Sequence, residues 1–236
     1  VIKVEVPPLG DITRVAATVR DGRSGYFVTV NRGKRSICVD VKNDRGLELI
    51  RSLIGDVDVV VENFRATVKT RLGIDYDTLR AVNPRIILAS ISGFGQTGPY
   101  AERAGVDQIV QGLSGLMSVT GHPGGGPVRA GIAISDTTAG MFLGQGILLA
   151  LLERERTGLG QWVHTSLLES MLSKLDFQGA RYTMLGEVPQ QQGNDHPMQV
   201  PMGTFEARDG PVNIAASTGR MFKDFCTALR AESMLD

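Results

Sequence analysis

The sequence predicts an α/β fold built around a mainly parallel sheet. Short β-branched runs alternate along the chain with segments whose apolar residues recur at helical spacing, a pattern typical of parallel strands joined by helices. Residues 57–61 read Val-Asp-Val-Val-Val, a nearly continuous apolar run that indicates a strand buried on both faces. From residue 186 onward the chain becomes polar and rich in turn residues, so we expect a linker there, followed by the start of a smaller α+β domain.

The expected strands are apolar, rich in β-branched side chains and bounded by turn residues. They cover residues 1–6, 36–39, 57–61, 86–91 and 161–166.

The expected helices begin at capping residues and end at glycine, proline or basic turns. Asp44 is placed to cap the first of them, and Pro84 follows the end of the second. They cover residues 44–54, 74–82, 106–116, 137–156 and 167–185.

These elements divide the chain into three parts. Residues 1–185 belong to a large α/β domain, and residues 186–202 form a linker. Residues 203–216 read as a hairpin around Asp209-Gly210, so residues 203–236 begin a small domain. The chain starts without Met inside a strand pattern and stops inside a helical one, and we therefore expect a fragment of a longer protein.

Charge and cysteine content narrow the class of protein. The 25 basic residues balance the 25 acidic ones, so no overall field favours nucleic acid or an acidic membrane surface. The longest apolar run, residues 141–152, is shorter than the roughly 20 residues needed to span a bilayer. Cys38 and Cys226 lie far apart and have no zinc-type spacing. We expect a cytoplasmic protein without a metal site or a membrane span.

Two glycine-rich or basic segments follow predicted strands, where ligands bind open α/β sheets. Residues 92–100 contain three glycines and form either an ordinary tight loop or a ligand loop; they do not match a dinucleotide-binding pattern. Asn63, Phe64 and Arg65, followed by Lys69 and Arg71, could hold a phosphate-bearing ligand with Phe64 as a packing face. The alternative for these residues is a capped helix with solvated charges.

Asp136 stands directly before the long apolar helix expected over residues 137–156. The simplest interpretation is an N-cap, because a carboxylate there accepts free backbone N–H groups. A second interpretation is a nucleophile, since small neighbouring residues would admit a substrate. His122, His164 and His196 are isolated from one another, so no hydrolase triad competes for this role.

Several segments together resemble the class III CoA-transferase family, typified by formyl-CoA transferase and L-carnitine CoA-transferase, which also includes α-methylacyl-CoA racemases. The resemblance covers the whole chain and depends on motifs that follow one another in the family's order. These motifs are residues 1–5, Gly10-Asp11, Thr13-Arg14, residues 31–36, residues 60–65, residues 92–95, residues 157–161 and Gly193-Asn194.

The resemblance implies a Rossmann-like open parallel sheet with helices on both faces, in a fold whose subunits form interlocked homodimers. It implies that Asp136 is the nucleophile, and that Asn63, Phe64, Arg65 and Arg71 line the coenzyme A pocket. The implied reaction moves coenzyme A from an acyl-CoA to a small carboxylic acid through an aspartyl anhydride and an aspartyl-CoA thioester. Coenzyme A is then a substrate, and no cofactor is bound permanently.

Two other functions stay open. The racemases of the family carry a histidine just before the aspartate that matches Asp107, whereas this chain has Val106 there, which disfavours racemisation. A non-catalytic coenzyme A or nucleotide-binding module is the other alternative, and it predicts that Asp136→Asn leaves function intact.

Overall fold

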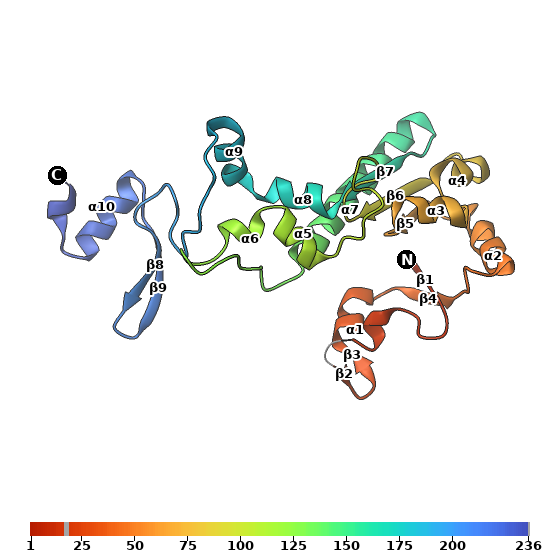
Figure 1. The fold of residues 1–236 in the computed structure, drawn as a ribbon, viewed down its shortest axis with the longest axis horizontal. Coiled ribbons are helices and arrows are strands. Elements are labelled where there is room, and N and C mark those ends of the chain that lie inside the picture. Colours follow the sequence, from red (N-terminus) through yellow and green to blue (C-terminus); the bar gives the residue numbers. More distant parts are fainter. Residues whose placement is uncertain (17–18, 236) are drawn as a thin grey trace. The chain divides into compact units, whose positions relative to one another are not determined.

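The computed structural model describes residues 1–16 and 19–235 (Figure 1). The chain forms two compact units, and each is interrupted once in sequence. Unit 1 contains residues 1–90 and 143–164, and unit 2 contains residues 91–142 and 165–236. Strands in parallel pairs alternate with helices, which confirms the predicted α/β class. The domain boundaries drawn from the sequence stay a prediction.

Unit 1 contains most of the strands. Its elements are β1 (Ile2–Glu5), η1 (Ile12–Arg14), β2 (Val19–Arg20), β3 (Arg23–Ser24), α1 (Gly25–Asn31), β4 (Arg35–Cys38), α2 (Asp44–Ile54), β5 (Val59–Glu62), α3 (Ala66–Leu72), α4 (Tyr76–Val82) and most of β6 (Ile87–Ser92), with the second half of α7 (Ile134–Thr157) and the start of β7 (Trp162–Ser166).

The parallel strands of unit 1 lie in two sheets. β1 pairs with β4, with Ile2 opposite Arg35, and β5 pairs with β6, with Val59 opposite Ile87. β7 lies on the other side of β6. The resemblance implies one open sheet, but β1–β4 and β5–β6–β7 form separate sheets, and side chains of β1 and β5 both line a groove of about 470 Å³.

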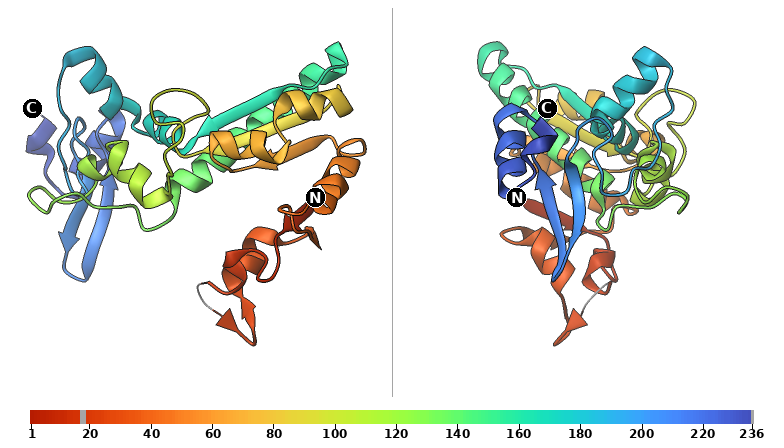
Figure 2. Two further views of the ribbon diagram at one scale, coloured as in Figure 1. Left: turned by 45° about the vertical axis from the view of Figure 1, so that its right-hand side comes forward. Right: turned by 90° about the vertical axis from the view of Figure 1, so that its left-hand side faces the viewer.

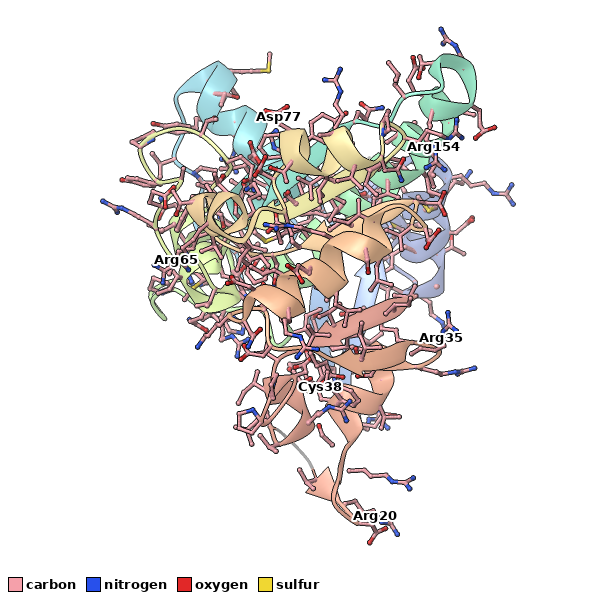
Figure 3. All side chains as sticks on the ribbon, turned by 90° about the vertical axis from the view of Figure 1, so that its right-hand side faces the viewer. Arg20, Arg35, Cys38, Arg65, Asp77 and Arg154 are labelled. Carbon is pink, nitrogen blue, oxygen red and sulfur yellow. The ribbon has the colours of Figure 1, made fainter. Side chains whose placement is uncertain are left out.

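The core of unit 1 forms where helices α2 and α4 cover strand β6. Ile54, Leu79, Ile86 and Leu88 are almost fully buried there. Burying one such side chain contributes roughly 1.5–3 kcal/mol. Near its end, α7 is fixed to this unit by Arg154, labelled in Figure 3. Its guanidinium donates to the Arg85 carbonyl (3.1 Å) and to the Asp58 carboxylate (2.9 Å).

Unit 2 is mostly helical. Its elements are α5 (Asp107–Leu113), α6 (Leu116–Val119), the first turns of α7, α8 (Leu167–Lys174), α9 (Asp176–Leu185), β8 (Met202–Ala207), β9 (Gly210–Ala215), α10 (Gly219–Ala228) and η2 (Glu232–Leu235).

Helices α5, α7 and α8 share the core of unit 2, where Val110, Ala139, Leu167 and Met171 are buried. The predicted hairpin is confirmed: β8 and β9 are antiparallel neighbours, seen side by side in Figure 2.

Several helix predictions differ from the structure. The helix expected over residues 74–82 begins at Tyr76, because Asp75 is its N-cap. The helix expected over residues 167–185 is two helices, because Asp176 adopts a positive φ of 48° and interrupts it. The helix expected over residues 106–116 ends at Leu113, and Gly115 at a φ of 90° separates it from α6. Asn43, and not Asp44, caps α2, because its side chain accepts the backbone N–H of Arg45.

The long helix α7 stands out by its composition. Among the described residues it is the one helix with the length and apolar character to cross a bilayer, and 28% of its most apolar stretch is buried within the protein. Leu148, Leu149 and Leu152 are each 67% exposed.

Candidate active site

Asp136 lies inside the first turn of α7, which corrects the N-cap predicted for it. The helix begins at Ile134 instead of residue 137, and Thr137 already donates its N–H to the Ala133 carbonyl (3.1 Å). The reason is that the first-turn N–H groups find their acceptor on another helix. Within the described residues, no hydrogen bond or ion pair reaches the Asp136 carboxylate, which is exposed to solvent.

The acceptor is Asp107, the first residue of α5. Its Oδ1 accepts the Ser135 N–H (2.9 Å) and the Ser135 hydroxyl (2.7 Å), and its carboxylate also accepts the N–H of Asp136. Its Oδ2 accepts a bond from the Gln111 amide (2.7 Å) and lies 3.8 Å from the Arg129 guanidinium. Asp107 therefore caps α7 from outside that helix.

The two carboxylates have opposite pKa shifts. Partial burial alone would raise the pKa of Asp107, but the hydrogen bonds from Ser135, Gln111 and the Asp136 backbone outweigh burial and hold this pKa below its usual range. For Asp136, desolvation by the surrounding protein and then the negative charge of Asp107 both raise the pKa. Asp107 is therefore an ionised helix cap. The Asp136 carboxylate is more basic than usual and accepts no hydrogen bond within the described residues.

The glycine-rich loop after β6 has a packing role. A Cβ on Gly93 would stand 2.6 Å from the Cα of Gly105, so the two backbone segments approach each other only because neither residue has a side chain. The Ser92 hydroxyl accepts the Gly95 N–H (3.0 Å), and the Gly93 carbonyl accepts the N–H of Leu168 (3.1 Å). These bonds favour the tight-loop interpretation of this segment.

The predicted coenzyme A residues all belong to unit 1. Asn63, Phe64 and Arg65 follow β5, and Arg65, labelled in Figure 3, is the residue before α3. Arg71 lies in the last turn of α3. All four side chains are exposed, and neither guanidinium makes an ion pair within the described residues. Asp136 belongs to unit 2.

Buried side chains hold the segment that follows β5 in place. The buried Glu62 accepts the Phe64 N–H (2.7 Å), and the Lys69 ammonium lies 3.8 Å from the same carboxylate. The Lys69 ammonium also lies 5.2 Å from the centre of the Trp162 ring. Asn63 and Phe64 line the groove between β1 and β5, together with Lys3 and Lys34 among its polar residues.

Sequence reasoning missed the residues that hold the site. The resemblance marks Asp107 only as the residue after Val106 and gives it no role, and Gln111 and Ser135 carry no motif. Ser135 also lies far from Asp107 along the chain. The spacing of Asp107 and Gln111, four residues apart on a helix, was the one local signal for a side-chain pair. Within the described residues, no group of three or more metal-binding side chains occurs.

The chain is similar to known proteins along its whole length. The family model described as CoA-transferase family III matches residues 1–236. The chain is 40% identical over 243 residues to a succinate–glutarate CoA-transferase of Agrobacterium fabrum, covering 100% of this chain and 61% of the relative. It is 40% identical over 234 residues to an acetyl-CoA:oxalate CoA-transferase of Acetobacter aceti, covering 99% of this chain and 60% of the relative.

Solved structures show the same similarity. A CAIB/BAIF family protein from Brucella suis has a TM-score of 0.85 at 39% identity. This match covers 98% of this chain and 62% of that protein's chain. The Mycobacterium tuberculosis protein Rv3272 has a TM-score of 0.88 at 28% identity. This match covers 100% of this chain and 62% of that protein's chain. The chain therefore spans about 60% of the length of these curated relatives and solved structures.

Proposed function

Because the chain belongs to CoA-transferase family III, we propose that the protein moves coenzyme A between carboxylic acids with Asp136 as its nucleophile. The observation that carries this proposal is the state of the Asp136 carboxylate. It is exposed, it has no hydrogen-bond partner within the described residues, and its pKa is raised. A carboxylate free of competing hydrogen bonds, and more basic than usual, is suited to attack an activated acyl carbon.

The proposed reaction begins at the thioester of the donor acyl-CoA. An Asp136 oxygen bonds to the carbonyl carbon, the carbon–sulfur bond breaks, and coenzyme A leaves as a thiolate, giving an acyl-aspartyl anhydride. The thiolate then attacks the Asp136 carbonyl carbon, which releases the donor acid and leaves an aspartyl-CoA thioester. Dividing one exchange into such covalent steps lowers each barrier.

The second half reverses these steps with another acid. The acceptor carboxylate attacks the aspartyl thioester, again releasing the thiolate, and the thiolate takes the acceptor's acyl group from the new anhydride. The products are a new acyl-CoA and the restored Asp136 carboxylate. Backbone N–H groups of the glycine-rich loops, other than that of Gly95, which the Ser92 hydroxyl already accepts, would stabilise the oxyanions, at a few kcal/mol for each donor.

The proposed binding site for coenzyme A lies on unit 1. Arg65 and Arg71 present exposed guanidinium groups that make no ion pair within the described residues, which suits the phosphates of this substrate. Phe64 is 38% exposed and offers a packing face, while Glu62 beneath it fixes the backbone. Asn63 completes this set beside the groove.

The acids are proposed to be small dicarboxylates. Curated relatives are named for succinate, glutarate, oxalate and mesaconate, and these names do not include formyl-CoA. Racemisation stays disfavoured because Val106, 60% exposed, stands where the racemases have a histidine. We also propose that the protein is a homodimer in the cytoplasm.

The test uses the full-length protein and a panel of succinyl-, glutaryl-, oxalyl- and acetyl-CoA. Each mixture is trapped with hydroxylamine, digested and analysed by peptide mass spectrometry. The expected label is on the peptide that contains Asp136, with one donor labelling best. Asp136→Asn should lose both label and transfer while still binding coenzyme A. Transfer that survives in Asp136→Asn would contradict the proposal.

A further inference from the structure

The beginning of α7 poses a physical question, because the first turn of any helix leaves N–H groups without partners inside the helix. An aspartate in the first turn or at the N-cap often accepts them with its own side chain. Asp136 has the right residue type and position for this, and yet its carboxylate accepts no such bond within the described residues. Something else must satisfy these donors.

We propose that Asp107 is a positioning residue for Asp136, because it caps α7 in place of Asp136 and so leaves the Asp136 carboxylate unengaged for attack. This inference rests on the proposed role of Asp136 as nucleophile. Two of its contacts come from consecutive backbone groups, the N–H of Ser135 (2.9 Å) and the N–H of Asp136. The cap therefore includes the backbone of the nucleophile itself.

Asp107 can perform this role because it is rigidly held. Its side chain is only 12% exposed, and the fully buried Gln111 donates to its Oδ2 at 2.7 Å. Gln111 also accepts the Ala130 N–H (2.8 Å) and donates to the Ile132 carbonyl (3.2 Å). The same amide thus fixes both the cap and the segment that leads into α7.

Ser135 completes the arrangement. Its side chain is fully buried, and its hydroxyl donates to Asp107 at 2.7 Å, beside the backbone bond of the same residue. This double contact fixes the backbone of the first turn, in which the next residue, Asp136, is exposed. Ser135 has no acid–base role in this arrangement.

The charge of Asp107 acts on Asp136 as well. A negative charge on the cap disfavours a second negative charge nearby, and together with desolvation it raises the pKa of Asp136. Arg129, which is 48% exposed and 3.8 Å from Asp107, is the basic group that pairs with this cap. A more basic carboxylate that is still ionised at neutral pH is the better nucleophile.

The test is Asp107→Asn in the full-length protein. The amide keeps the size of the side chain and one acceptor oxygen, but it removes the charge. We expect kcat to fall about tenfold to a hundredfold with little change in KM for acyl-CoA, because a misplaced nucleophile slows chemistry more than binding. The acid limb of kcat/KM should move to lower pH, because loss of the neighbouring charge lowers the pKa of Asp136.

The matched control is Asp75→Asn. Asp75 also caps a helix, since its side chain accepts the N–H and the hydroxyl of Thr78 at 3.1 and 2.9 Å, but it belongs to unit 1. Asp75→Asn should lower thermal stability as much as Asp107→Asn does. Its pH profile of kcat/KM should be the same as that of the wild type. A similar shift of the acid limb in both variants would overturn the inference.

Ser135→Ala is a second test of the role of Asp107, and it applies even if Asp107→Asn fails to fold. It removes one bond and keeps the charge, so kcat should fall about threefold to tenfold while the acid limb stays in place. Unchanged kcat in Ser135→Ala, or wild-type kcat and pH profile in Asp107→Asn, would overturn the role of Asp107. Full activity of Asp136→Asn would instead overturn the proposed function, so the two failures are distinguishable.

Discussion

At the scale of single residues, the structure shows how one buried carboxylate can organise a chain segment. Glu5, at the end of β1, is 5% exposed and accepts hydrogen bonds from Arg14, Ser36 and Asp11. Two come from the Arg14 guanidinium (both 2.7 Å), one from the Ser36 hydroxyl (2.5 Å) and one from the Asp11 N–H (2.9 Å). The hydrogen bonds from Arg14, against the opposing effect of burial, hold the pKa of Glu5 far below its usual range.

Glu5→Gln is expected to lower the free energy of unfolding by about 1–3 kcal/mol, because hydrogen bonds to a charged group are lost and buried donors are left unpaired. The depressed pKa means that Glu5 stabilises the fold at pH values above the pKa of an unfolded glutamate and loses this effect as pH falls toward the folded value. The difference between wild type and variant should therefore shrink in strong acid. Urea unfolding at neutral and acid pH measures it, and a difference independent of pH would contradict the linkage.

The same scale shows what the sequence could not predict about the site. Asp136 is indicated by its position before a long helix and by the resemblance, but Asp107 is not, because its contact with Ser135 depends on how α5 and α7 pack. Tertiary contacts of this kind have no local pattern. For the same reason the N-cap interpretation of Asp136 is wrong.

At the scale of elements, the prediction is most accurate where local signals are complete. The bounds of α2, Asp44–Ile54, are predicted correctly because its apolar residues follow one face and polar capping residues precede it. The break between α8 and α9 is not predicted because neither Gly nor Pro marks it, and a single aspartate with positive φ makes the turn.

The turn after α7 gives an element-scale prediction. A Cβ on Gly160 would lie 1.8 Å from the Ile86 carbonyl oxygen, and backbone atoms cannot move aside as a flexible side chain can. Gly160→Ala should therefore lower the free energy of unfolding by more than about 3 kcal/mol, or prevent folding. Thermal denaturation and soluble yield measure this effect.

Gly158→Ala is the control for that turn. Gly158 has a φ of 74°, but a Cβ added to it would meet no atom within 4 Å, so only the left-handed backbone is penalised, at about 1–2 kcal/mol. Equal effects of the two substitutions would mean that backbone conformation, and not the contact with Ile86, limits the residue at position 160.

At the scale of the whole molecule, α7 has more apolar surface than the described residues cover. Leu148 and Leu152 lie on one face of the helix, four residues apart, and each is 67% exposed. Exposed apolar surface of this kind is typical of an interface with another chain. The additional length of the relatives and the proposed homodimer both offer a covering surface.

Leu148→Glu combined with Leu152→Glu should shift the full-length protein from dimer toward monomer, because two charges would replace apolar contact area. Sedimentation velocity at micromolar concentration measures the change. Glu155→Gln, on the same helix with a 72% exposed side chain, is the control that should leave the dimer intact. A wild-type protein that sediments as a monomer would contradict the proposed assembly.

The exposure of Asp136 has a consequence for what the protein produces. An acyl-aspartyl anhydride reacts with water as well as with a thiolate, and although water is the weaker nucleophile, it is present at far higher concentration. If the intermediate formed on a carboxylate as accessible as Asp136 is in the described residues, hydrolysis would compete with transfer and waste the donor thioester. Whatever covers Asp136 during the proposed reaction therefore limits how much of the donor thioester is lost to hydrolysis.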